Sequence, residues 1–146
     1  MKLQSIDESV RPDHCYLTDE DQCYFWGTYV SRQSYNYSPM NQIISNLKKG
    51  MNKKGQKDWQ YKFHAIEECS QLMSTLSFKP TLKITFIPVP PSKKKGDPLY
   101  DDRLVQILNK VYSSCPALKD VDGVDILPLV YPPNVEGAPN SIEEYI

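Results

Sequence analysis

The sequence predicts an α/β fold in which helices flank a partial parallel sheet, preceded by an N-terminal β-hairpin. Three segments in succession support it: an apolar, β-branched strand near Ile84–Val89, a helix near Asp101–Tyr112 with leucine, isoleucine and valine at helical spacing, and a second strand near Val124–Leu129. A strand, a helix and a strand in this order form a βαβ unit, whose two strands run parallel. We expect residues 1–146 to form a single domain, because this length suits one hydrophobic core.

The two ends of the chain are expected to lie outside the α/β core. Residues 1–37 form the hairpin arm, because His14–Leu17 and Cys23–Val30 are rich in aromatic and β-branched residues and are separated by a polar turn. Residues 131–146 contain three prolines and little apolar pattern, which indicates an extended tail. The α/β core is therefore predicted over residues 38–130.

Two further helices are predicted at the start of this core. Ser38 offers an N-cap hydroxyl and Pro39 suits a first helical turn, after which apolar residues recur at helical spacing until Gly50. The stretch 48–57 contains two glycines and five lysines and is expected to be a loop. A longer helix is predicted over residues 58–76, whose apolar stripe includes Trp59, Phe63, Ile66, Cys69, Leu72, Met73 and Leu76.

The charges are unevenly distributed along the chain. Residues 46–96 contain eleven lysines and three acids, a net charge of +8, whereas the rest of the chain carries −9. Such a block indicates a positive face that could meet phosphate or nucleic acid, and the alternative is a set of solvated lysines on exposed helices and loops. The candidate nucleic-acid-binding residues are Lys48, Lys49, Lys53, Lys54 and Lys57.

The cysteines and the first residues bear on metal binding and location. None of the cysteines at positions 15, 23, 69 and 115 forms a CxxC pair, and His14, Cys15 and Cys23 have no evident fourth ligand nearby. We therefore expect thiols rather than a metal, although the sequence leaves open whether Cys15 and Cys23 bind one. The start has no apolar signal region and no run is long enough to cross a membrane, so the expected location is the cytoplasm, with no membrane partner.

Two segments, in order, carry a resemblance to a known family. The first is Ile43-Ile44-Ser45-Asn46-Leu47-Lys48, followed by a basic, glycine-containing stretch and a long helix. The second is Phe86-Ile87-Pro88-Val89-Pro90-Pro91-Ser92-Lys93-Lys94-Lys95-Gly96, followed by a helix. Together, over residues 35–112, they resemble the ComF-like phosphoribosyltransferase family of prokaryotes, in which a Leu/Ile pair and Leu-Lys-Gly pattern precedes a Val-Pro-Val-Pro strand end and a basic loop. The resemblance implies a phosphoribosyltransferase-like fold.

The loop after the proline-rich strand end is the predicted phosphate-binding site. The resemblance implies that it is the pyrophosphate-side loop, and Mg²⁺ would accompany a phosphoribosyl donor if one binds; no other cofactor is expected. Ligands of open α/β sheets bind beyond the carboxyl ends of the strands, where cations, a hydroxyl and backbone N–H groups suit a phosphate. The alternative is a plain surface turn. The predicted residues are Ser92, Lys93, Lys94, Lys95 and Gly96.

One part of the family pattern is absent. Phosphoribosyltransferases carry a later strand that ends in two acids and a Thr/Gly-rich loop, which hold the ribose 5-phosphate; here no acid pair has this context, and Asp101-Asp102 sits at a helix start, where capping explains it. The family's N-terminal zinc module is missing or reduced to Cys15 and Cys23. The pattern therefore resembles the N-terminal half of such an enzyme.

These observations predict two functions. The first is a truncated or split phosphoribosyltransferase-like protein that binds a phosphate-containing ligand, is inactive alone and acts with a protein partner or second half. The alternative is a non-catalytic module that binds nucleic acid or nucleotides in a DNA-uptake or defence-type system. A stand-alone hydrolase or nuclease is disfavoured, because no Ser-His-Asp, Cys-His or HExxH arrangement occurs.

Overall fold

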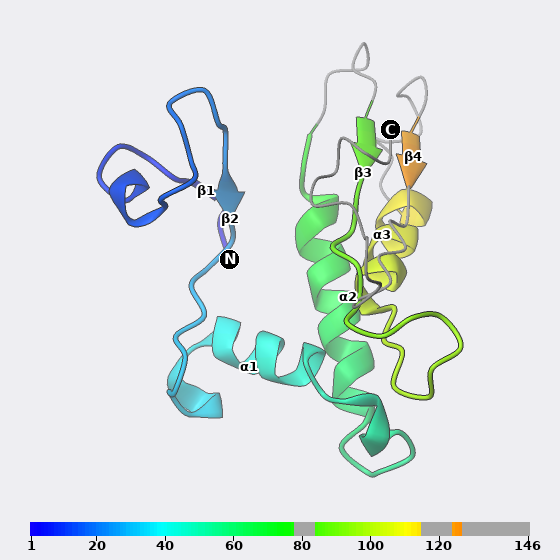
Figure 1. Cartoon of the computed structure of the whole chain (residues 1–146). Helices are drawn as coiled ribbons and strands as arrows, with labels where there is room; N and C mark the ends of the chain where they lie inside the picture. Colours follow the sequence, from blue (N-terminus) through cyan, green and yellow to red (C-terminus); the bar gives the residue numbers. More distant parts are fainter. Residues whose placement is uncertain (78–83, 115–123, 127–146) are drawn as a thin grey trace, which may run out of the picture. The chain divides into compact units, whose positions relative to one another are not determined.

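The computed structural model describes residues 1–77, 84–114 and 124–126. Its chain divides into two compact units, Met1–Asn46 and Leu47–Ile146, which we call the N-terminal unit and the C-terminal unit (Figure 1). Helices and short strands both occur, so the mixed α/β class is confirmed. The predicted tail at 131–146 lies outside the described residues.

A short antiparallel pair organises the start of the N-terminal unit. Strand β1 (Gln4–Ser5) pairs with β2 (Tyr24–Phe25), with Ser5 opposite Tyr24. The predicted hairpin is therefore wrong in its first strand, because residues 14–17 form a turn and not a strand, and its second strand is much shorter than the predicted Cys23–Val30.

Local hydrogen bonds explain this difference. A 3₁₀ turn, η1 (Arg11–Asp13), contains a proline in its first positions, and the Arg11 guanidinium donates to the carbonyl of Thr18. The carboxylate of Asp21 accepts hydrogen bonds from the backbone N–H and the hydroxyl of Thr18, at 2.7 and 2.8 Å. Asp and Thr side chains that bond nearby backbone groups compete with strand pairing, so these polar residues hold the aromatic segment between them in turns.

Helix α1 (Pro39–Leu47) begins where the sequence predicts, just after η2 (Tyr35–Tyr37). The Ser38 hydroxyl accepts the Asn41 N–H at 3.0 Å, which confirms the predicted N-cap. The Asn41 side chain is almost fully buried and bonds both backbone groups of Val30, donating to its carbonyl at 3.0 Å and accepting from its N–H at 3.1 Å. The chain before α1 is thereby tied to the first turn of the helix.

Two helices form the core of the C-terminal unit. After a 3₁₀ turn, η3 (Met51–Lys53), come α2 (Gln60–Ser74) and later α3 (Arg103–Ser114), both within about two residues of the predicted bounds. The helices pack together, and burial of apolar surface on both stabilises them. The buried apolar residues of this pair are Ala65, Ile66, Ile107, Leu108 and Val111.

The buried stripe of α2 differs from the predicted one. Phe63, expected in the core, is 52% exposed, whereas Lys62 is only 2% exposed. Successive helical residues point about 100° apart, and the buried positions Lys62, Ala65, Ile66 and Ser70 follow helical spacing. Phe63 therefore lies to one side of the stripe that the tertiary structure selects.

Strands β3 (Ile84–Phe86) and β4 (Val124–Ile126) pair in parallel, with Ile84 opposite Val124. Since α3 lies between them in the chain, the described part of the βαβ unit agrees with the prediction (Figure 1). β3 ends three residues earlier than predicted, and the apolar residues Ile87 and Val89 beyond it are 48% and 72% exposed. The prolines that alternate with them lack the N–H that a longer ladder needs.

Candidate functional site

Two loops of the C-terminal unit lie beside the first turn of α3. One follows α1 and the other follows β3, at the carboxyl end of that strand. The second loop folds as consecutive turns, in which Asp97 N–H donates to the Lys94 carbonyl at 3.1 Å and Tyr100 N–H to the Asp97 carbonyl at 2.9 Å. Gly96 has a φ of +98°, which favours glycine. The turns leave Lys94 and Lys95 exposed at the loop tip.

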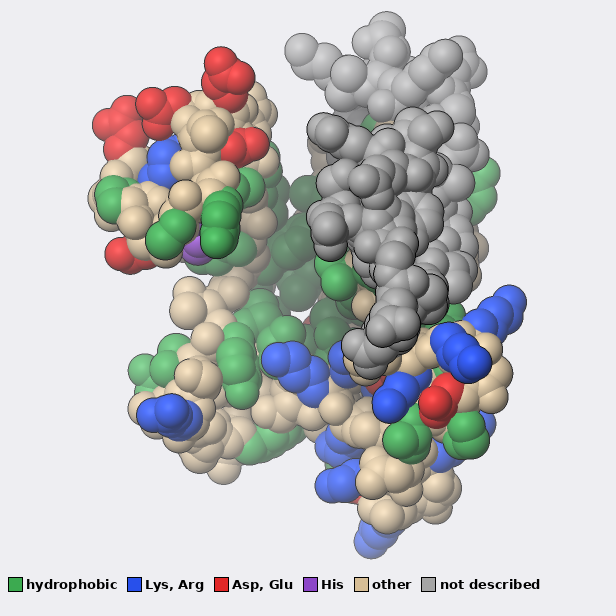
Figure 2. Space-filling view, viewed as in Figure 1, with side chains coloured by type: hydrophobic (Ala, Val, Ile, Leu, Met, Phe, Trp, Pro, Cys, Tyr) green, Lys and Arg blue, Asp and Glu red, His purple; other side chains and the backbone are tan. Residues whose placement is uncertain are grey.

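These loops line an open cavity of about 400 Å³, which we call the basic cavity. Lys48 and Gly50 line it from the loop after α1, Ser92 and Lys93 from the loop after β3, and Arg103 from α3. The two segments on which the family resemblance rests, far apart in the sequence, thus meet at one site. Figure 2 shows Lys and Arg side chains gathered over the same loops.

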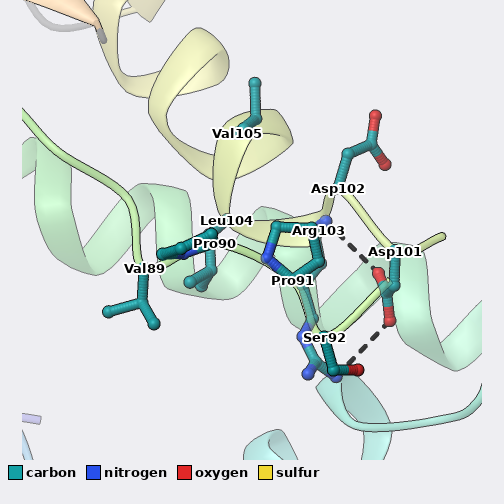
Figure 3. A pocket seen from close by; sticks show the side chains of 9 residues that line it. All are labelled: Val89, Pro90, Pro91, Ser92, Asp101, Asp102, Arg103, Leu104 and Val105. Atoms are coloured by element: carbon teal, nitrogen blue, oxygen red, sulfur yellow. Dashed lines mark hydrogen bonds and ion pairs between the residues drawn. The ribbon is translucent and has the colours of Figure 1, made fainter. Parts of the chain in front are cut away.

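A second cavity of about 190 Å³ shares Pro91, Ser92, Asp101 and Arg103 with the first (Figure 3). Its other walls are mainly apolar and include Val89 and side chains of the first turn of α3. This second cavity adjoins the basic cavity and could receive an uncharged part of a larger ligand.

The acid pair at the start of α3 lies in the wall of this second cavity. The carboxylates of Asp101 and Asp102 point in different directions (Figure 3). Asp101 Oδ1 accepts the Arg103 N–H at 3.2 Å, and Asp102 Oδ1 accepts from the Gln106 amide at 2.5 Å. Both acids therefore accept hydrogen bonds from the first turn of α3, as predicted for acids that cap a helix.

A buried lysine connects the walls of the basic cavity. Lys62 Nζ donates to the carbonyls of Leu47 and Lys49, at 3.0 and 2.8 Å, and to Asp101 Oδ2 at 2.7 Å. Arg103 Nη1 donates to the same Leu47 carbonyl at 2.9 Å and lies 3.5 Å from Asp101 Oδ2. Burial lowers the pKa of Lys62, and the hydrogen bond that Lys62 donates to Asp101 opposes this.

Sequence reasoning did not single out Lys62 or Arg103. The available signal for Lys62 was its spacing, because it lies three residues after Trp59 and four before Ile66, which are both buried. A lysine inside an apolar helical stripe needs buried acceptors, but the sequence does not say which loops supply them.

Some of the predicted site residues line the basic cavity and others do not. Of the predicted phosphate-binding residues, Ser92 and Lys93 line the basic cavity, whereas Lys94, Lys95 and Gly96 do not. Of the five candidate nucleic-acid-binding lysines, Lys48 lines it. Lys49 Nζ lies 3.6 Å from Asp58 Oδ2 and 5.4 Å from the centre of the Tyr61 ring. The remaining three lysines, Lys53, Lys54 and Lys57, are exposed.

The described cysteines are free thiols. Cys15 is exposed, Cys23 and Cys69 are half-buried, and burial raises the pKa of Cys69 to about 11, so this thiol stays protonated at neutral pH. Within residues 1–77, 84–114 and 124–126, no three His, Cys, Asp or Glu side chains gather as a metal site would need. Across these same residues, every helix is too short or too polar to cross a bilayer.

No protein-family model, curated protein or solved structure matches this chain. The ComF-like assignment therefore stays a prediction carried by the two quoted segments.

Proposed function

We propose that this chain binds a phosphate-containing anion in the basic cavity. The observation that carries this proposal is the meeting of Lys48, Lys93 and Arg103 around one cavity with the Ser92 hydroxyl beside them. Among the described residues that line the cavity, three are cations and one is an acid, Asp101, which is paired with Lys62 and Arg103. Cations and a hydroxyl are the groups with which proteins bind phosphate oxygens.

The volume favours a ligand larger than one phosphate. A cavity of about 400 Å³ falls within the range of small-molecule sites, roughly 300–1,000 Å³. Pyrophosphate, or the phosphates of a nucleotide with its remainder in the adjoining cavity, would suit this space and charge.

The activity that we propose is that of a phosphoribosyltransferase-like domain which is inactive alone and acts with a partner or second half in the cytoplasm. Both segments that resemble the ComF-like family line the cavity, which supports the first part. The engagement of Asp101 and Asp102 in contacts at the start of α3 supports the second, because ribose-binding acids must be available to the donor. Without them the reacting carbon is not positioned, and positioning can supply roughly 7–11 kcal/mol of a barrier.

The alternative function, a module that binds nucleic acid, is supported by a different observation. Lys53, Lys54 and Lys57 are exposed on the loop whose first residues line the basic cavity. A longer polyanion that entered the cavity could extend along these lysines, and its affinity would then depend strongly on salt.

A pair of double variants tests where the anion binds. Lys48→Ala with Lys93→Ala removes two charges from the cavity wall, and Lys53→Ala with Lys54→Ala removes two from the same basic surface outside it. In titration calorimetry with pyrophosphate, with and without Mg²⁺, we expect the first variant to weaken binding about tenfold or more, roughly 1.4 kcal/mol. The second should change it less than threefold. Equal losses, or no binding by the unsubstituted chain, would refute the proposed site.

The same variants separate the two functions. With a short single-stranded oligonucleotide, a loss in the outer variant as large as in the cavity variant, with a shallower salt dependence in both, would favour the nucleic-acid module. With phosphoribosyl pyrophosphate and Mg²⁺, the transferase-like function predicts binding through the cavity without release of pyrophosphate.

A further inference from the structure

A single buried ammonium group joins three segments of the C-terminal unit. Lys62 on α2 bonds the carbonyls of Leu47 and Lys49 at the start of one loop and the carboxylate of Asp101 at the start of α3. All three donors of the ammonium group are therefore used. We infer that Lys62 positions the walls of the basic cavity and neutralises Asp101 within it, an inference that rests on the proposed anion binding.

The positioning follows from where the two carbonyls lie. They belong to the residues on either side of Lys48, whose side chain lines the cavity, so one ammonium group holds the backbone of Lys48 from both sides. Arg103, which also lines the cavity, donates to the Leu47 carbonyl from α3. The loop after α1 is thus held against the start of α3 at the edge of the site.

The neutralisation follows from where Asp101 lies. Asp101 lines both cavities and its side chain is 15% exposed, so an unpaired charge there would repel an entering anion. Lys62 Nζ lies 2.7 Å from Asp101 Oδ2, and Arg103 Nη1 lies 3.5 Å from it. Without Lys62, Arg103 would be the remaining cation beside Asp101 among the residues that the structure describes, and a closer pair with Asp101 would withdraw Arg103 from the ligand.

A buried lysine is a costly way to stabilise a helix pair. Taking an ammonium group out of water carries a large desolvation cost, and buried ion pairs are often replaced by apolar residues without loss of stability. The sequence nevertheless has a lysine in the buried stripe of α2, with all its acceptors near the cavity. A role of Lys62 in positioning the cavity walls and neutralising Asp101 explains both the buried position of the lysine and the location of its acceptors.

The test compares Lys62→Met, Asp101→Asn and the two together, with pyrophosphate as the probe in titration calorimetry. Lys62→Met leaves the acid unneutralised and should weaken binding about tenfold or more. Asp101→Asn removes the repelling charge and should tighten binding by about twofold to threefold, and the double variant should recover most of the loss. Lys110→Met is the matched control, because Lys110 also pairs with an acid, Glu67 at 2.7 Å, but does not line the cavity.

A purely structural lysine gives another pattern. If Asp101→Asn weakens binding as much as Lys62→Met, and the double variant is no better, the neutralising role is overturned. Lys62→Gln, which keeps polar contacts and removes the charge, replaces Lys62→Met if the latter does not fold.

A ligand-free measurement separates this inference from the proposed function. If the unsubstituted chain does not bind pyrophosphate, the proposed function fails. Amide exchange then decides the positioning role: it should rise at Lys49–Asn52 in the Lys62 variant but not in Lys110→Met. Unchanged exchange in this loop would overturn the inference.

Discussion

The N-terminal unit and the C-terminal unit are each stabilised internally by a different kind of interaction. In the N-terminal unit the buried residues are Asn41 and Ile43. Its backbone conformation is held by hydrogen bonds between side chains and the backbone: Asn41 bonds Val30, and Arg11 and Asp21 both bond Thr18. Many of its tyrosines are exposed, up to 97% for Tyr16. Figure 2 shows Asp and Glu side chains gathered over the loop between β1 and β2.

In the C-terminal unit a stripe of apolar residues on α2 and α3 is buried, and one charged cluster is embedded beside it. Apolar burial contributes in proportion to area and tolerates many sequences, whereas a buried charge needs particular partners. The comparison indicates that the C-terminal unit is stabilised mainly by apolar burial and contains a buried charge that needs particular partners. The N-terminal unit depends on single hydrogen bonds.

The largest expected effect concerns the apolar core. Ile66→Ala should lower the free energy of unfolding of the C-terminal unit by about 2–5 kcal/mol, because Ile66 is 1% exposed and its loss leaves a cavity. Urea denaturation followed by Trp59 fluorescence, with Trp26→Phe in every variant, measures this. Ile87→Ala is the matched control, since Ile87 is 48% exposed. A similar loss in both variants would mean that the α2–α3 interface is not the main source of stability.

An intermediate effect should come from the N-terminal unit. Asn41→Ala removes hydrogen bonds to both backbone groups of Val30 and should cost about 1–3 kcal/mol locally, because part-buried polar groups lose their partner. Amide exchange at Val30 should become faster, while exchange in α2 should not change. Asn109→Ala, an exposed position on α3, is the control. If exchange in α2 rose equally, the two units would not be independently stabilised.

The smallest effect concerns a surface ion pair. Lys110 donates to Glu67 at 2.7 Å and holds the pKa of that carboxyl below its ordinary value of 4.5. A lowered folded pKa gives stability that is present above the unfolded value and is lost as the pH falls through the folded one. Glu67→Gln should therefore make the melting temperature slightly less sensitive to acid below about pH 4.5. Glu68→Gln is the control, and an equal change there would assign the effect to general charge.

Local sequence patterns determined much of the fold. Ser38 and Pro39 specify the start of α1 because a cap acts on the next three residues, and the apolar spacing of α3 specifies a helix whatever packs against it. The parallel pairing of β3 and β4 followed from the short strand–helix–strand order. The basic loop after β3 was likewise evident as a candidate anion site, because its lysines are adjacent in the chain.

Other features depended on contacts between distant segments. Tyr24 pairs with Ser5 because local hydrogen bonds hold the nearer aromatic segment in turns. The buried face of α2 passes through Lys62 because its acceptors come from a loop at residues 47–49 and from Asp101, which is 39 residues away in the chain. Which lysines line a cavity was decided in the same way, since Lys48 and Lys93 meet only when these loops are held together. Propensities and caps act over a few residues, whereas burying a charge requires the whole packed arrangement, and this is why tertiary structure alone distinguishes the site from the surrounding surface lysines.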